Sequence, residues 1–463
     1  MRLERHDDYI LIENKHIIYM SKELQEILLN EKRDNDQSAL SQIEEILKNS
    51  ENKKLHLVGL SDMHAGYVFP VGSVVACEIT ENKGHISFSG IGGDINCGVR
   101  CLVTNLFYED IKNDISKLAD ALYQAIPTVQ NARVFLKDKK PLSQKEIKII
   151  LREGIKSLDN IKLYHEESIL ERVEIHKCEV KEETGNFIKM EGNIESNGSI
   201  KTDIEGITQK QIGKGIASIG SIGSGNHYLE IQKVDKVYDE NSFLKKDQIV
   251  VFIHCGSRGL GHEINRNYNE NNKEKDLFTE YSADKENIML NCINAATNYA
   301  FVNREIISMI VKKVFKGFYG HSKIETLCDC GHNTIKIEKI ENKEYIIHRK
   351  GASMVKKEEF MAVGGSMDTF SYILQGEECD KTFNSTCHGS GRVVPRTKAN
   401  HLFKYEQVME NMEEIELRAE TKRGIIEECG LCYKNIANVV DNCVKMKIVK
   451  KVSKNKPLIV IKG

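Results

Sequence analysis

The sequence predicts a mixed α/β fold: one large domain over residues 1–463, with a metal pocket formed at strand ends and a β-rich arm inserted at residues 165–212. Stretches with helical spacing of apolar residues alternate with short apolar runs that are typical of strands. Several of these runs end directly at His or Asp in loops, where α/β proteins commonly place functional side chains. A length of 463 residues allows two or three domains, but it also suits one α/β unit that carries an insertion.

The predicted elements follow one another in mixed order. Residues 36–50 place Leu40, Ile43 and Ile46 on one helical stripe. Further helices are predicted at 110–125, 143–160, 286–315 and 403–420, and strands at 55–60, 248–253, 345–348 and 457–461. We expect the first of these strands to deliver Asp62 to a turn and the second to end at His254.

The pattern changes between about Glu171 and Ile207. Short alternating runs at 173–175 and 187–190 are broken by turn sequences at 184–186 and 196–198. Alternation with Gly- and Asn-containing turns is typical of hairpins. This segment is therefore predicted to form a charged β-hairpin arm inserted in the main domain.

Composition indicates a globular protein with an ample core, since 40% of the residues are hydrophobic and 29% are charged. No run of 18 apolar residues occurs, and the charged residues 1–8 do not suit a signal peptide, so no membrane partner is expected. Thirteen Cys without a compact framework favour a reducing compartment, and we expect a cytoplasmic protein.

The net charge of −2 excludes a generally basic nucleic-acid-binding surface. One local cationic segment stands out, because the chain after Asp441 carries seven Lys and no acidic residue. Two interpretations stay open: a solvated face, or a patch that contacts a nucleic-acid backbone.

The most informative stretch is residues 92–101, Gly-Gly-Asp-Ile-Asn-Cys-Gly-Val-Arg-Cys. Asp94 and Cys97 offer an oxygen and a sulfur ligand from one glycine-rich turn. Four later Gly-containing loops each carry a His, at His227, His254, His332 and His388. Together the five loops predict a metal pocket, and thiolate with imidazole would by itself favour zinc.

These loops also carry a family resemblance. The motifs are Asp62-Met63-His64-Ala65-Gly66-Tyr67, Pro70-Val71-Gly72-Ser73, Asp94-Ile95-Asn96-Cys97-Gly98, Ser224-Gly225-Asn226-His227-Tyr228-Leu229-Glu230, His254-Cys255-Gly256-Ser257-Arg258-Gly259, His348-Arg349-Lys350-Gly351-Ala352, Cys387-His388-Gly389-Ser390-Gly391-Arg392 and Val460-Ile461-Lys462-Gly463. In this order, from about residue 55 to the last residue, the sequence resembles the RtcB family of GTP-dependent RNA ligases.

The resemblance implies an enzyme that joins RNA ends bearing a 2′,3′-cyclic phosphate or 3′-phosphate to 5′-hydroxyl ends, in RNA repair or tRNA splicing. It implies GTP and two Mn²⁺ ions as cofactors, and His388 as the nucleophile that carries GMP. Asp62 is the second expected catalytic residue. The implied metal ligands are Asp94, Cys97, His227, His254 and His332, with the Cys97 thiolate as a bridge.

The resemblance also implies a nucleotide site. The sequence contains no Walker A motif, because Gly213-Lys214-Gly215 lacks the Ser/Thr and the required spacing, so the nucleotide would be bound differently from that of P-loop proteins. The expected nucleotide-binding residues are Asn226, Tyr228, Glu230, Asn333, Ser366, His388, Gly389, Ser390, Gly391, Tyr433 and Lys462. A carboxylate at Glu230 can accept both N1–H and N2–H of guanine. Arg258 and Arg392, each four residues after a site His, are expected to contact RNA phosphate.

The chain departs from the family at residues 364–368, where Gly-Gly-Ser-Met-Asp stands in place of the usual Pro-Gly-Ser-Met-Gly. Loss of Pro and gain of Asp368 bear on nucleotide binding. Two alternatives to a ligase are a metal-dependent phosphoesterase and a non-catalytic RNA-binding paralogue. The presence of His388 and Lys462 favours the ligase over a phosphoesterase, because hydrolysis needs neither residue.

Overall fold

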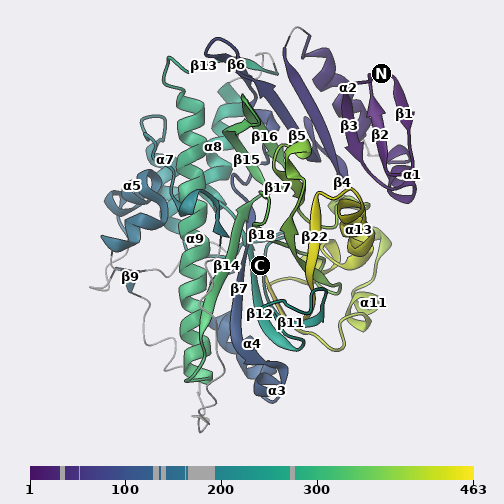
Figure 1. Cartoon of the computed structure of the whole chain (residues 1–463). Coiled ribbons are helices and arrows are strands. Elements are labelled where there is room, and N and C mark those ends of the chain that lie inside the picture. The colour runs from purple at the N-terminus through teal and green to yellow at the C-terminus, as the bar shows by residue number, and fades with distance from the viewer. Residues whose placement is uncertain are drawn as a thin grey trace.

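Two mixed β-sheets organise the molecule (Figure 1). This computed structural model describes residues 1–31, 37–51, 53–128, 135–136, 142–161, 163–164, 193–271 and 277–463. Within them the first sheet has the strand order β1-β2-β3-β4-β5-β16-β15, and the second has the order β10-β14-β7-β12-β11-β22-β19-β18 with β21 beside β22. Helices pack around both sheets, which confirms the mixed α/β prediction.

The bounds of the strands are as follows. The first sheet contains β1 (Leu3–Arg5), β2 (Tyr9–Ile12), β3 (His16–Tyr19), β4 (Leu55–Tyr67), β5 (Phe69–Glu78), β15 (Asn333–Ile340) and β16 (Lys343–Lys350). The second contains β7 (Gly98–Phe107), β10 (Asn193–Ile194), β11 (Tyr228–Val237), β12 (Gln248–Cys255), β14 (Ile324–Gly331), β18 (Phe360–Val363), β19 (Ser371–Gly376), β21 (Glu416–Ala419) and β22 (Val449–Lys462). Short pairs are formed by β6 (Lys83–Ile86) with β13 (Thr279–Ser282), β8 (Phe135–Leu136) with β9 (Leu163–Tyr164), and β17 (Ala352–Met354) with β20 (Ser385–Cys387).

The α-helices are α1 (Lys22–Leu29), α2 (Ala39–Lys48), α3 (Tyr108–Ile111), α4 (Ile115–Ala125), α5 (Gln144–Glu153), α7 (Gln209–Ser218), α8 (Arg258–Asn271), α9 (Ile288–Phe318), α10 (Arg396–Leu402), α11 (Tyr405–Glu410), α12 (Lys422–Glu427) and α13 (Ile436–Lys445). Short 3-10 helices occur at η1 (Phe88–Gly90), η2 (Gly154–Asp159), η3 (Glu195–Gly198), η4 (Cys379–Thr382) and η5 (Gly430–Cys432). The predicted helix at 143–160 becomes α5 and η2, because Gly154 takes a φ of +59°.

Helix α9 and the second sheet hold the loop that precedes β7 (Figure 1). Every residue of β12 is buried, and α9 lies along this sheet. From α9, the fully buried Arg304 donates to Asp329 of β14 at 2.7 Å and to the carbonyl of Asn96 at 2.9 Å. A buried guanidinium with these hydrogen-bond partners can move little. Arg304 therefore restrains the backbone between Asp94 and Cys97.

Two local predictions were wrong. Asp62 does not lie in a turn, because β4 continues to Tyr67 with an irregular register between Gly59 and His64. The predicted helix at 403–420 ends early: α11 stops at Glu410, and β21 pairs in parallel with the end of β22. In each case strand pairing determines a backbone whose local pattern indicated something else.

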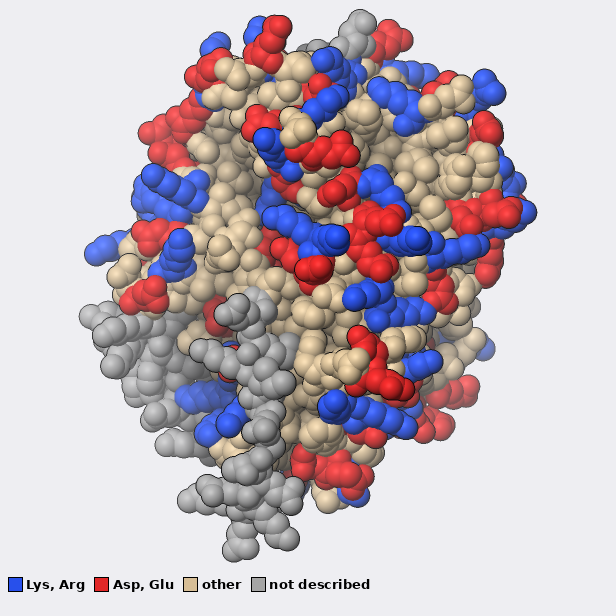
Figure 2. All heavy atoms as spheres, in the orientation of Figure 1, with Lys and Arg blue, Asp and Glu red and all other residues tan. Residues whose placement is uncertain are grey.

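The Lys-rich segment near the end is mainly a strand inside the second sheet. Strand β22 pairs with both β11 and β19. Lys451 pairs with Asp441, Lys454 with Asp235 at 2.9 Å, and Lys456 with Glu414. These acidic partners compensate much of the local positive charge. On the face seen in Figure 2, basic and acidic side chains are likewise interspersed.

The predicted arm at 165–212 falls largely outside the described residues, since only 193–212 are described. Within that part, β10 pairs in parallel with β14. Glu195 accepts from the backbone of Gly331 at 2.6 Å, so this segment packs close to the His332 loop. The hairpin expected upstream remains a prediction.

Candidate functional site

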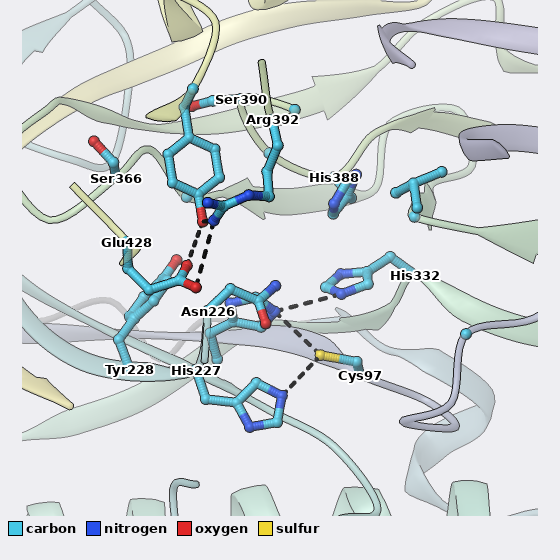
Figure 3. Close-up of a pocket in the computed structure, with 18 of the residues that line it drawn as sticks. Cys97, Asn226, His227, Tyr228, His332, Ser366, His388, Ser390, Arg392 and Glu428 are labelled. Atoms are coloured by element: carbon cyan, nitrogen blue, oxygen red, sulfur yellow. Dashed lines mark hydrogen bonds and ion pairs between the residues drawn. The ribbon is translucent and has the colours of Figure 1, made fainter. Parts of the chain in front are cut away.

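A cavity of about 230 Å³ lies where the predicted loops converge (Figure 3). Most of the sequence-predicted residues line it: Asp94, Cys97, Asn226, His227, Tyr228, His254, His332, Asn333, Ser366, His388, Gly389, Ser390, Gly391, Arg392, Tyr433 and Lys462. Three predicted residues, Asp62, Glu230 and Arg258, are not among the residues that line it. The strand-end pocket expected from the sequence is therefore present in the fold.

Cys97 stands at the centre of two potential ligand triads (Figure 3). Its Sγ lies 3.2 Å from Nε2 of His227 and 3.2 Å from Nε2 of His254. Nε2 of His254 lies 3.4 Å from Nε2 of His332, and Nε2 of His227 lies 2.9 Å from Oδ2 of Asp94. The donor atoms of Asp94, Cys97 and His227 fall within 4.8 Å of one another, as do those of Cys97, His254 and His332.

The electrostatics of this cluster fit a divalent cation. Burial lowers the pKa of His254 and of His332 well below the usual range, so both imidazoles are neutral and keep a lone pair. Burial also raises the pKa of the Cys97 thiol well above its usual value, so the thiolate needs a cation beside it. For Asp94, burial opposes ionisation, yet the neighbouring His227 side chain keeps the carboxyl pKa below its normal value.

Backbone and side-chain contacts orient the ligands. Oδ1 of Asp94 accepts from the backbone N–H of Arg258 at 2.9 Å, which turns Oδ2 toward His227. Nδ1 of His227 lies 3.0 Å from the carbonyl oxygen of Ile222, so this nitrogen carries the proton and leaves Nε2 free for a metal. The guanidinium of Arg258 lies behind His227, 3.3 Å from Nδ1.

His388 and Asp62 form a second functional pair. Oδ2 of Asp62 accepts from the backbone N–H of His388 at 2.8 Å and contacts Nδ1 of His388 at 2.6 Å. A carboxylate only accepts, so the proton sits on Nδ1 and the lone pair on Nε2. The His388 ring lies 4.9 Å from the His332 ring, centroid to centroid.

The glycines after His388 make this pairing possible. Gly391 has a φ of +72°, and a Cβ there would lie 2.1 Å from the carbonyl oxygen of Asp62. No other residue could bring the loop so close to β4. The spacing of the Cys387–Arg392 motif is thus explained by close backbone approach.

The opposite end of the cavity carries a charged cluster built around Glu428 (Figure 3). The Glu428 carboxylate accepts from Tyr433 Oη and from Arg396 Nε at 2.6 Å, and it lies 3.4 Å from the guanidinium of Arg392. Arg392 also donates to Tyr433 Oη at 2.8 Å. Coulombic attraction from Arg396, Lys462 and Arg392 outweighs burial and holds the pKa of Glu428 low.

Two further carboxylates adjoin this end. Burial raises the pKa of Glu230 to about 8, and Gln232 Nε2 donates to it at 2.5 Å. Asp368, one of the two residues that depart from the family pattern, accepts from Ser366 Oγ and from the backbone of Gly430, each at 2.8 Å. Asp368 thus ties the Ser366 loop to η5, immediately before Tyr433.

Sequence reasoning missed Glu428, Arg396 and Lys434. Glu428 and Arg396 line the cavity. Lys434 is buried, and its Nζ donates to the carbonyls of Met63 and Ser61, which flank Asp62. Nothing around these positions distinguishes them from surface charges, although Lys434 directly follows Tyr433 and could have been singled out for that reason.

Comparison with known proteins decides the family. The model of the family described as tRNA-splicing ligase RtcB matches residues 47–463, which include every site residue named above. The chain belongs to the RtcB family. It is therefore an RNA-ligase enzyme, as the sequence resemblance predicted.

Curated RtcB relatives cover most of the chain. RNA-splicing ligase RtcB homolog 2 of Entamoeba dispar is 36% identical over a 445-residue alignment that covers 88% of this chain and 80% of that protein. The tRNA-splicing ligase RtcB of Methanococcus maripaludis is 32% identical over a 457-residue alignment that covers 88% of each protein. Among the described residues of this RtcB member, no helix is long and apolar enough to cross a membrane.

Proposed function

We propose that this RtcB member is a GTP- and Mn²⁺-dependent ligase that joins RNA 2′,3′-cyclic phosphate or 3′-phosphate ends to 5′-hydroxyl ends through a His388–GMP intermediate, in RNA repair or tRNA splicing in the cytoplasm. The observation that carries the proposal is the 2.6 Å contact between Asp62 and Nδ1 of His388, beside a cluster of potential metal ligands. This pairing prepares a nucleophile that simple hydrolysis would not need.

The donor set suits two ions. Asp94, Cys97 and His227 would hold one, and Cys97, His254 and His332 the other, with the thiolate shared. When bound, Mn²⁺ ions supply charge that neutralises phosphate oxygens and favours ionisation of a coordinated hydroxyl. Manganese is the metal of the family resemblance, whereas thiolate and imidazole ligands would also accept zinc.

The chain's own residues account for nucleotide transfer. His388 Nε2 attacks the α-phosphorus of GTP, forming a P–N bond while the bond to pyrophosphate breaks. Asp62 stabilises the positive charge that develops on the ring, because its carboxylate faces Nδ1–H. The Gly389–Gly391 segment leaves room for the phosphate next to backbone N–H groups.

Ligation then proceeds through an activated RNA 3′ end. Water opens a cyclic phosphate to a 3′-phosphate, and an oxygen of this 3′-phosphate takes GMP from His388 as the P–N bond breaks. The 5′-hydroxyl oxygen attacks the 3′-phosphorus, GMP leaves, and the hydroxyl proton is released. A bare 3′-phosphate could not react in this way, since it would have to expel hydroxide or oxide.

Arg392 and Arg258 occupy different positions, which indicates that they have different roles. Arg392 lines the cavity, and in this position it can contact the terminal RNA phosphate. Arg258 lies behind His227, and its backbone holds Asp94. We assign Arg258 to the positioning of the metal ligands, and only Arg392 to RNA phosphate.

The experiment that tests the function uses the purified protein with Mn²⁺ and α-³²P-GTP, followed by a denaturing gel and by ligation of an RNA with a 3′-phosphate to a 5′-hydroxyl RNA. Labelled protein and a joined product support the ligase. RNA dephosphorylation without labelled protein would support a phosphoesterase, and RNA binding alone would support a non-catalytic paralogue.

We predict that Glu230→Gln weakens GTP binding and reduces the preference for GTP over ATP. Reading N1–H and N2–H of guanine requires an ionised carboxylate, and burial raises the pKa of Glu230 to about 8. GTP affinity of the unmodified protein should therefore increase as pH rises through about 8, because the ionised fraction increases. Glu230→Gln should lose this pH dependence. Equilibrium GTP and ATP binding across a pH series measures both effects; an unchanged nucleotide preference would assign guanine recognition to another residue.

A further inference from the structure

Lys434 is a buried lysine to which the proposed reaction steps give no role. It follows Tyr433, lies just before α13, and is 5% exposed. It is not among the residues that line the cavity, so a ligand held there would not touch it. Burying an ammonium group is costly unless specific partners replace the lost water. The partners of Lys434 therefore indicate what this side chain does.

The Lys434 ammonium holds the backbone on both sides of Asp62. Its Nζ donates to the carbonyl of Met63 at 2.5 Å and to the carbonyl of Ser61 at 3.4 Å. Both carbonyls belong to the stretch of β4 whose register with β5 is irregular. Since regular pairing does not determine the backbone there, Lys434 contributes to the position from which the Asp62 side chain extends.

The main chain of Lys434 contacts the loop that carries His388. Its backbone N–H donates to the carbonyl of Gly391 at 2.9 Å. Helix α13, which begins two residues later, packs against β4 (Figure 1). One residue thus holds the strand of Asp62 with its side chain and the loop of His388 with its main chain.

The Asp62 carboxylate carries a buried charge that a nearby cation can balance. Asp62 is fully buried, and its Oδ1 has no hydrogen-bond partner among the described residues. Burial lowers the pKa of Lys434 to about 8, and attraction to Asp62 opposes this effect of burial. The amine is therefore mostly protonated at neutral pH. A second acid, Glu31, attracts the amine less strongly, and its carboxylate already accepts from two backbone N–H groups.

The geometry also keeps Lys434 from opposing the reaction at His388. Lys434 contacts the backbone around Asp62 rather than its carboxylate. By contrast, Oδ2 of Asp62 lies 2.6 Å from Nδ1 of His388. Because Coulombic energy falls with distance, attraction between Asp62 and a cationic His388 ring exceeds the repulsion from Lys434.

We propose that Lys434 is a positioning residue for the transfer of GMP to His388: it holds the backbone of Asp62 and balances the charge of the Asp62 carboxylate. The inference rests on the proposed function, since it concerns the His388–GMP step. Lys434 acts through Asp62 and not through contact with GTP, metal ions or RNA.

The first test separates the rate of GMP labelling from GTP binding. Lys434→Met keeps the length of the side chain but removes its charge and its hydrogen-bond donors. At saturating GTP, the labelling rate should fall by about 10- to 100-fold, the range found when a supporting partner of a functional side chain is removed. The GTP concentration for half-maximal labelling and the metal content should each change by less than about twofold, because Lys434 contacts neither site.

Two further variants separate charge from packing. Lys434→Arg keeps the charge and should label faster than Lys434→Met; if it retained its metal and labelled no faster, the role of the charge would be contradicted. Lys445→Met is the matched control, since it removes another lysine charge from α13, one that pairs with Asp8 at 2.7 Å. This control should label at the wild-type rate.

The outcomes of the first test distinguish the inference from the proposed function. An unchanged labelling rate in Lys434→Met would overturn the inference alone. Loss of metal and of GTP affinity in step with the rate would show that Lys434 only supports the fold, and would also overturn it. Failure of the wild-type protein to label would refute the proposed function, and this inference with it.

The Asp62→Asn background tests whether Lys434 acts through the carboxylate. Without a charge on residue 62, the ammonium has nothing to balance. Lys434→Met should then slow the remaining labelling by about threefold or less, a smaller factor than in the wild-type background. An equal factor in both backgrounds would contradict action through Asp62.

Discussion

His388→Ala is expected to abolish covalent GMP labelling. The labelling rate should fall by about 10⁴-fold or more, which is below detection. Ala offers no lone pair that could replace the imidazole held beside the Asp62 carboxylate. Metal content should stay near normal, because His388 belongs to neither ligand triad. Acid-labile, base-stable label on a denaturing gel measures the covalent GMP, and metal analysis of the same sample measures the metal content.

Asp62→Asn is the informative companion variant. It keeps an oxygen that can accept from Nδ1–H but removes the charge that stabilises a cationic ring, so labelling should slow by about 100-fold or more while some label persists. Full labelling in His388→Ala would locate the nucleophile elsewhere. Normal labelling in Asp62→Asn would show that the 2.6 Å contact only positions the ring.

The loops that carry the potential metal ligands were predictable because each is a short contiguous motif. The sequence places Asp94 and Cys97 three residues apart in one turn, and His254 is the last residue but one of the buried strand β12. Once the strands pair, these loops must meet at the same edge of the sheet. Local pattern was enough, because these side chains lie at or directly beside strand ends: Cys97 precedes β7, His227 precedes β11 and His332 follows β14.

The rest of the site depends on packing that no local pattern records. Glu428 is buried only because Arg392, Arg396 and Tyr433 converge on it from neighbouring segments. Arg258 occupies a loop position equivalent to that of Arg392, yet it turns behind His227 since Gly223 leaves space for its guanidinium. The strand at 416–419 forms because β22 offers it a free edge, which overrides the helical spacing.

The shared position of Cys97 leads to the other large expected effect. Cys97 is the one residue common to both triads of potential ligands within the described residues, and its Sγ is equally distant, at 3.2 Å, from His227 and His254. A ligand that serves a single ion could be removed with the loss of that ion alone. A bridging thiolate also offsets the repulsion between two neighbouring cations, so its removal affects both.

Cys97→Ala should therefore lose metal from both positions and weaken Mn²⁺ binding by about 100-fold or more, above the range found when outer-shell partners of a metal are removed. Cys101→Ala is the matched control, since it deletes another buried thiol, in the strand β7 that directly follows Cys97, without touching a triad. Both variants lose a similar buried volume, so a difference in metal stoichiometry measures ligation rather than packing. If Cys97→Ala kept half or more of its metal together with full GMP labelling, the thiolate would not be shared, and the two triads would have to be assigned to separate ions held by His and Asp alone.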